Sequence, residues 1–160
     1  AARGGPKVKQ AGGNAIKHYA NFILEFEERY NSDLIFKNPT ASKLEDKGEP
    51  IGHYCKIRFR KSVNEKTGST VRYPIQYGKK DGKSIWRARE ILDMLYLFKL
   101  IDKKGAWISV SEDLISELAD KKFEINEKFQ GEQRLIDFLE ENEGLSEFLY
   151  EDFQKLTNAL

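Results

Sequence analysis

The chain has 160 residues, of which 39% are hydrophobic and 33% charged, the composition of a soluble globular domain or of a domain with part of a second. No apolar run approaches the roughly 18 residues of a membrane span and no signal peptide is visible, so we expect no membrane partner. The single cysteine, Cys55, excludes an internal disulfide and fits a reducing compartment such as the cytoplasm. Because it lies in a strand-like run, we expect it to be a buried structural thiol.

The formal net charge of +1 conceals a difference between the two halves of the chain. Residues 1–83 contain 17 Lys and Arg against 9 Asp and Glu, which gives +8. Residues 84–160 contain 10 against 17, which gives −7. A basic half indicates a polyanionic partner. Alternatively, the charge difference between the two halves reflects only random variation of surface residues.

The first third of the chain predicts a loop, a short helix and a strand. Residues 1–13 are rich in Gly and Lys and read as a loop. Residues 14–20 read as a short helix with Asn14 as its N-cap. Residues 21–28 alternate as a strand with one apolar face. The polar stretch 37–50 reads as a loop.

Two further strands are predicted at 54–62 and 71–77, and a turn at 64–68 makes them an antiparallel pair. The alternation of the first of these strands sets its basic residues on one face: Lys56, Arg58 and Arg60. This basic stripe has two interpretations. It either contacts a polyanion or is a solvated outer face that protects an edge strand.

After Gly78 the apolar period changes to three and four residues, which predicts an amphipathic helix over 84–100. A short strand follows at 105–110, and we expect its Trp107 to pack in a core. Three further helical stretches are predicted: 114–118, 135–139 and 145–156. The changes of period and charge sign divide the chain into domains 1–80 and 81–160.

The sequence lacks the motifs of several enzyme classes. It contains no G-x-x-x-x-G-K-[ST] phosphate loop, so we expect no nucleotide hydrolysis by this chain alone. His18 and His53 are far apart and have no Cys or His near them, so zinc is not expected. The carboxylates around 25–28 and 140–143 are interpreted as solvated faces and not as a catalytic pair.

Five segments, in this order, resemble the C-terminal half of RecA-family recombinases. They are GGNAIKHYA at 12–20, KIRFRKS at 56–62, IQYG at 75–78, LIDKKGAW at 100–107 and FQG at 129–131. The resemblance implies an α/β fold, namely the C-terminal part of a RecA-like ATPase core followed by a small α/β lobe. Since the chain starts without Met and within the basic, Gly-rich loop that runs into the first motif, we expect it to be a C-terminal fragment, and a phage-type member is compatible with its divergence.

The resemblance also implies a function in DNA recombination, repair and the SOS response. Such proteins use ATP to self-assemble into a helical filament on single-stranded DNA. The filament takes up double-stranded DNA and exchanges homologous strands. ATP and Mg²⁺ would be bound mainly by the N-terminal part of the parent protein, which this chain lacks. The parent is thus expected to be a DNA-dependent ATPase, and this chain alone inactive.

The resemblance assigns DNA-binding roles to two groups of residues. The first group is the end of the second DNA-binding loop: Arg3, Lys7, Lys9, Gly12, Gly13 and Asn14. Glycines there let the backbone approach phosphates, and the cations add salt-dependent attraction. The second group, Lys103 and Lys104, matches a basic spot of the C-terminal lobe that gathers duplex DNA. A second basic spot of the family aligns with Glu132.

The resemblance further assigns contacts between subunits. Of two lysines that reach a neighbouring subunit's ATP in the family, one aligns with Lys61, for which Arg60 is the fallback. The other aligns with Val63. Lys17 and His18 would lie at the subunit interface, although the family has an aromatic residue where His18 stands.

Two alternatives remain at this point. A free-standing, winged-helix-like DNA-binding module without ATPase activity would use the predicted helix 84–100 and the strand at 106–110. The mixed charges and apolar residues of that helix count against a recognition role. A protein-interaction scaffold with no nucleic-acid role is the other alternative, and the basic Gly-rich arm counts against it.

Overall fold

The computed structural model describes residues 18–37, 41, 43–63 and 66–158, and the structural statements below concern those residues. The chain divides into two compact units. The first unit comprises Ala1–Asn31 and Cys55–Arg72, and the second comprises Ser32–Tyr54 and Tyr73–Leu160. The predicted domains 1–80 and 81–160 stay a prediction, because packing units and evolutionary domains need not coincide.

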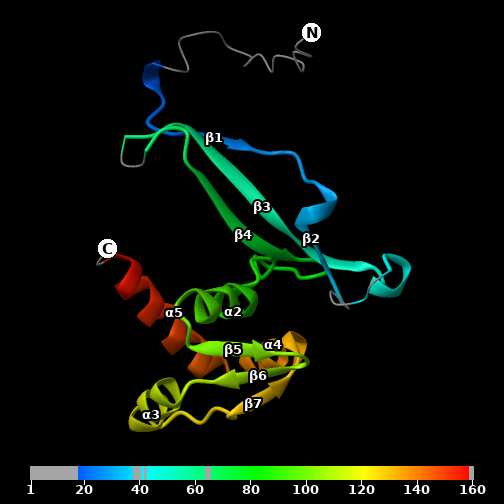
Figure 1. Cartoon of the computed structure of the whole chain (residues 1–160). Helices are drawn as coiled ribbons and strands as arrows, with labels where there is room; N and C mark the ends of the chain where they lie inside the picture. Colours follow the sequence, from blue (N-terminus) through cyan, green and yellow to red (C-terminus); the bar gives the residue numbers. More distant parts are fainter. Residues whose placement is uncertain (1–17, 38–40, 42, 64–65, 159–160) are drawn as a thin grey trace. The chain divides into compact units, whose positions relative to one another are not determined.

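The described residues form an α/β structure with two antiparallel sheets (Figure 1). The strands are β1 (Ile23–Phe26), β2 (Leu34–Phe36), β3 (Pro50–Lys61), β4 (Thr70–Gln76), β5 (Ile101–Lys104), β6 (Trp107–Val110) and β7 (Lys128–Gln130). The α-helices are α2 (Arg87–Leu97), α3 (Glu112–Asp120), α4 (Glu132–Glu141) and α5 (Glu143–Asn158). Two short 3-10 turns lie at Asn31–Asp33 and Glu45–Lys47.

The long strand β3 contributes residues to both units. Its C-terminal part pairs with β1 in the first unit, and its N-terminal part pairs with β2 in the second. Strand β4 also pairs with β3. The other sheet has the order β5-β6-β7 and lies wholly in the second unit.

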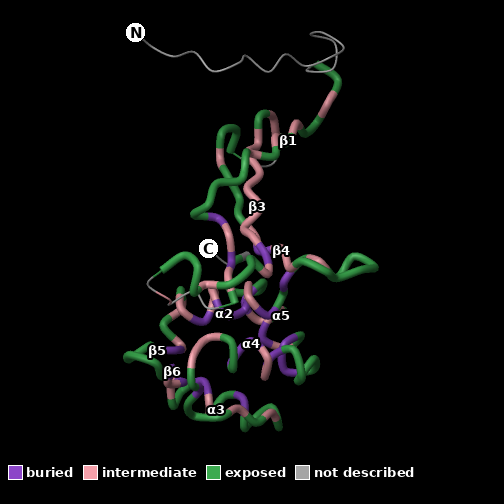
Figure 2. Tube along the Cα trace, turned by 90° about the vertical axis from the view of Figure 1, so that its right-hand side faces the viewer, coloured by how far each residue is buried: buried purple, intermediate pink, exposed green. Residues whose placement is uncertain are grey.

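The apolar core lies in the second unit. Helices α2, α4 and α5 pack against one another, while α4 contacts β7 and α2 contacts β5. The largest fully buried side chains come from α2, β6, α3 and α4: Ile91, Leu92, Leu95, Ile108, Leu118, Leu135, Ile136 and Leu139. Figure 2 shows buried stretches along these helices. The apolar residues spaced three and four apart in the sequence therefore form the buried faces of these helices.

The predicted strands 21–28, 54–62 and 71–77 are confirmed as β1, β3 and β4, with different bounds. Strand β3 begins at Pro50 and not at residue 54. The last residue of the predicted loop 37–50 therefore belongs to a strand. Pro50 is a loop signal in the sequence, but proline is tolerated at the first residue of a strand. In the structure, Gly52 is required in the strand because the backbone of β4 passes so close to it.

Three short strands were not predicted: β2, β5 and β7. The helix predicted over 84–100 is also shorter in the structure, since α2 spans Arg87–Leu97. Lys99 has a φ of 57°, a left-handed conformation that ends the helix before residue 100. The chain then enters β5, a segment between the predicted helix and the predicted strand 105–110 for which the sequence predicted no element.

The prediction for Trp107 is wrong, because its side chain is 50% exposed. Strand β6 buries Ile108 and Val110, and alternation along the strand sets Trp107 on the opposite face. The core tryptophan is instead Trp86, which is 2% exposed. Its indole N–H donates to the Glu140 carboxylate at 2.8 Å. Cys55 is half-buried, so the expectation of a buried thiol is met only in part.

Candidate nucleic-acid interface

The predicted DNA-binding arm lies outside the described residues. This applies to Arg3, Lys7, Lys9, Gly12, Gly13 and Asn14, and to the predicted interface residue Lys17. Their roles therefore stay predictions. The remaining candidates, which are His18, Arg60, Lys61, Lys103 and Lys104, are all described.

The structure brings together His18 and Lys61, two residues that the sequence assigned to subunit contacts. Lys61 ends β3 opposite Ile23 of β1, and the chain just before β1 leads back to His18. The Lys61 ammonium group donates a hydrogen bond to the backbone carbonyl of His18 at 3.3 Å. The contact uses the backbone and not the imidazole, so it does not depend on an aromatic side chain at position 18.

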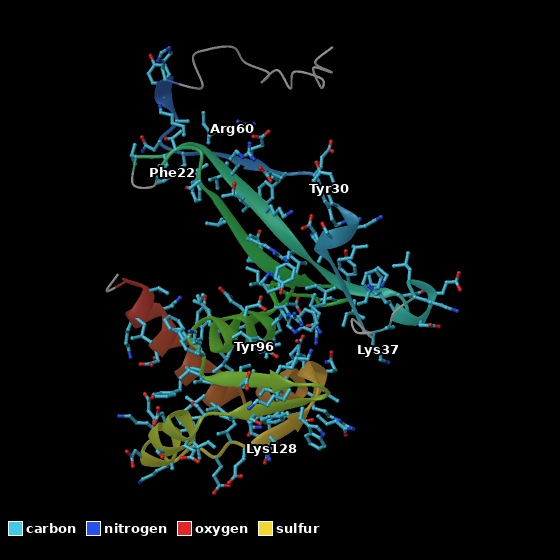
Figure 3. All side chains as sticks on the ribbon, in the orientation of Figure 1. Phe22, Tyr30, Lys37, Arg60, Tyr96 and Lys128 are labelled. Carbon is cyan, nitrogen blue, oxygen red and sulfur yellow. The ribbon has the colours of Figure 1, made fainter. Side chains whose placement is uncertain are left out.

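The basic stripe of β3 is largely neutralised by the neighbouring strand. Arg58 forms an ion pair with Glu27, and Arg60, which is labelled in Figure 3, forms one with Glu25. The hydrogen bond from Arg60 lowers the pKa of Glu25, and the same contact raises the pKa of Arg60. The acidic residues at 25 and 27 are therefore partners of the stripe. Lys56 lies 5.8 Å from the centre of the Tyr30 ring, within reach of a cation–π contact.

The opposite face of the same strands is apolar. Leu24 pairs with Phe59 and Phe26 pairs with Ile57 across β1 and β3. Leu24 is 47% exposed and Phe26 is 64% exposed. The first unit thus has one charged face with matched ion pairs and one apolar face with much of its surface open.

Lys103 and Lys104 lie on β5 in the second unit, and both have acidic neighbours. The Lys103 ammonium lies 3.2 Å from a carboxylate oxygen of Glu132, and the Lys104 ammonium lies 3.4 Å from Asp102. The Lys104 side chain is 85% exposed, whereas that of Lys103 is 34% exposed. Lys104 is therefore open to a partner, while Lys103 is held by an internal carboxylate.

Glu132 binds a second cation, Arg89 of α2. The Arg89 guanidinium donates to Glu132 at 3.1 Å and to the Tyr54 hydroxyl at 3.1 Å. The Tyr54 hydroxyl in turn donates to Asp93 at 2.7 Å. Burial and the hydrogen bond to Asp93 raise the pKa of Tyr54. Although burial opposes its charge, the contacts with Tyr54, Asp93 and Glu132 raise the pKa of Arg89.

Tyr96 adds a further donor to Glu132. Its hydroxyl lies 3.5 Å from the carboxylate, at the limit of a hydrogen bond. Burial and the nearby negative charge of Glu132 raise the pKa of Tyr96 to about 12. The cluster thus connects α2, β5 and the start of α4 through one carboxylate.

A cavity of about 230 Å³ opens beside this cluster. Its lining includes the cationic side chains of Lys37, Arg89 and Lys103, the carboxylate of Glu132 and the backbone of Gly131. The sequence predicted a role for Lys103 but missed Lys37, because strand β2, which ends one residue before it, was not recognised. A cavity with cations on its rim can accept an anionic group.

Among the residues with described positions, no group of three His, Cys, Asp or Glu side chains is arranged to hold a metal ion. None of the described helices combines the length and the apolar character that crossing a bilayer requires.

No family model matches the chain. Curated proteins do match it. The chain is 30% identical to Protein RecA of Delftia acidovorans over 84% of its length and 29% of that protein. It is 26% identical to Protein RecA of Marinobacter nauticus over 82% of its length and 29% of that protein. It is also 26% identical to Protein RecA of Bacillus thuringiensis over 85% of its length and 35% of that protein.

The chain spans about a third of the length of these relatives. Since the matches extend through both compact units, they do not rest on a single motif. The resemblance stated from the five segments is confirmed: curated proteins named RecA match about 85% of this chain at 25–30% identity.

Proposed function

We propose that this chain is part of an ATP-dependent recombinase, which forms filaments on single-stranded DNA and promotes homologous strand exchange. The observation that carries the proposal is the similarity to RecA over about 85% of the chain. Because the chain spans about a third of those relatives, ATP and Mg²⁺ would be bound mainly by residues that this segment does not include.

The proposed DNA contacts fall in two places. The basic arm with Lys7 and Lys9 would bind single-stranded DNA through phosphates, together with the backbone at Gly12 and Gly13. Lys104, whose side chain is 85% exposed, would contact duplex DNA from strand β5. Phosphate contacts of this kind do not depend on the base sequence.

Lys61, with Arg60 as its fallback, is the proposed ATP contact to a neighbouring subunit. A cation beside the γ-phosphate stabilises the charge that develops during transfer. Lys61 reaches the backbone of His18, so a change at the nucleotide could be transmitted to the segment that leads to the DNA-binding arm. Arg60 is engaged by Glu25, which favours Lys61.

The DNA-binding part of the proposal is tested with the variant Lys7→Ala/Lys9→Ala. We expect affinity for a fluorescein-labelled single-stranded oligonucleotide to fall alike for all base sequences. Log affinity decreases linearly with log salt concentration. If both lysines contact phosphates, the variant should show a shallower dependence, with a slope smaller in magnitude by about 1.4. Fluorescence anisotropy over a series of salt concentrations measures both quantities.

The matched control is Lys79→Ala/Lys80→Ala, which removes the same charge from an exposed turn. The control variant is expected to bind much as the unmodified chain does. An equal loss in both variants would mean that only the net charge matters. No loss in the arm variant at low salt would remove the arm from the proposal.

The ATP-dependent part is tested on the complete reading frame. A G-x-x-x-x-G-K-[ST] loop within an α/β region before Ala1 is expected, and Lys61→Ala in that longer protein should abolish DNA-stimulated ATP hydrolysis. A reading frame without such a loop would contradict the ATP-driven mechanism.

The winged-helix alternative is not favoured. Helix α2, which would have to be its recognition helix, has only two exposed residues, Arg87 at its start and Leu97 at its end. A recognition helix needs an exposed face of polar side chains to read the major groove.

A further inference from the structure

The Glu132 carboxylate has the environment of an anion bound to a cationic site. It lies 3.1 Å from the Arg89 guanidinium and 3.2 Å from the Lys103 ammonium, and the Tyr96 hydroxyl lies 3.5 Å away. The side chains of Glu132 and Arg89 are only 19% and 18% exposed. Charge-assisted bonds of this type are stronger than those between neutral groups, and more so where water is partly excluded.

The same donors suit a phosphate group. Guanidinium and ammonium groups bind carboxylates and phosphates with similar geometry, because both ligands offer negatively charged oxygens. The adjoining cavity of about 230 Å³ is large enough for one such group, and Lys37 contributes a third cation to its lining. A phosphate arriving at this cavity would meet donors that Glu132 already occupies.

We propose that Glu132 is an internal competitor of phosphate: its carboxylate holds Lys103 and Arg89 and thereby lowers the affinity of this lobe for the backbone of duplex DNA. The inference rests on the proposed DNA-binding function and adds a residue that limits it. Lys103 is the donor that changes partner, since it is the more exposed of the two cations.

Arg89 would keep its place when Glu132 no longer holds it. Its guanidinium also donates to Tyr54 and lies 3.6 Å from Asp93 on the same helix. If Glu132 loses its charge, Arg89 still has the Asp93 carboxylate beside it. Lys103, in contrast, loses the carboxylate to which it is paired. The cavity gains one net positive charge, while the anchoring of α2 to Tyr54 is retained.

The test is the variant Glu132→Gln in the whole 160-residue chain, with a fluorescein-labelled duplex oligonucleotide as the probe. Gln keeps the size of the side chain and removes its charge. We expect roughly threefold to tenfold tighter binding, as for one additional charge-assisted contact. The slope of log affinity against log salt should steepen by about 0.9, the value for one more phosphate.

Two further variants make the test specific. Glu141→Gln removes the same charge from an exposed position at the end of α4, so it measures the effect of net charge alone. Lys103→Ala in the Glu132→Gln background should return the affinity to that of the unmodified chain or below it. Urea unfolding of each variant establishes that it is folded.

The outcomes separate this inference from the proposed function. Equal gains for Glu132→Gln and Glu141→Gln, or a gain that persists without Lys103, would overturn the role of Glu132. If the unmodified chain binds duplex DNA and Glu132→Gln binds no better, this inference alone fails. If neither binds at any salt concentration, this inference fails and the lobe is also removed from the proposed DNA contacts.

Discussion

Gly52 lies on β3 at the point where the backbone of β4 comes closest to it. A methyl group at this position would lie 2.3 Å from the carbonyl oxygen of Ile75 and 3.4 Å from the Trp86 ring. Neither neighbour can move easily, because one is strand backbone and the other is a core side chain. The absence of a side chain at residue 52 therefore allows the second unit to close around Trp86.

We expect Gly52→Ala to lower the free energy of unfolding by about 1–3 kcal/mol, since overpacking displaces backbone. Urea denaturation followed by tryptophan fluorescence measures this. Gly144→Ala is the matched control: its added methyl group would be 3.8 Å from Phe123, an ordinary contact in a helix, where Ala is favoured over Gly. Equal effects of the two substitutions would contradict the steric argument.

Among the helices, α3 shows how one side chain defines the start of an element. Ser111 precedes the helix with extended backbone angles, and its hydroxyl accepts a hydrogen bond from the Leu114 amide at 3.3 Å. Glu112 and Asp113 follow in the first turn, where negative charge is favourable. The sequence reading found the apolar stripe of this helix but not its cap.

The variant Ser111→Ala should lower the free energy of unfolding by about 1 kcal/mol, because an amide of the first turn loses its acceptor. The variant Ser111→Asp, which keeps an acceptor, should cost little. Chemical denaturation of the three proteins side by side decides the matter. If Ala and Asp behave alike, the cap does not contribute to stability.

Some secondary-structure elements could be predicted from the sequence and others could not, for a physical reason. The helices α2, α4 and α5 bury long stripes, so their period is visible over several turns. Strands β2 and β7 have three residues each, which is too short for an alternation to be recognised. Their positions depend on pairing with distant strands, which local sequence does not specify.

The same reasoning applies to the candidate site. Lys103 and Lys104 could be selected from the sequence, because a resemblance pointed to them. The ion pair of Lys103 with Glu132 could not be predicted, since it forms only when the β5-β6-β7 sheet brings the start of α4 beside β5. Arg89 reaches the same carboxylate from α2, which a pattern within one helix does not reveal.

Over the whole molecule, apolar burial is uneven. Every apolar side chain that is buried among the described residues belongs to the second unit. The first unit instead holds its strands through hydrogen bonds between β1 and β3, exposed ion pairs and partly exposed apolar residues. Exposed ion pairs contribute little to stability. The two units should therefore differ in how readily their backbones open.

Hydrogen–deuterium exchange of the whole chain tests this difference. We expect amide protons of β1 and of residues 55–61 to show protection factors at least about tenfold lower than those of α2 and α4, because local opening exposes little additional apolar surface there. Strand β6 has partners on both sides, as residues 55–61 of β3 do, and is therefore the internal control for strand geometry. Equal protection of residues 55–61 and β6 would mean that a contact other than apolar burial stabilises the first unit.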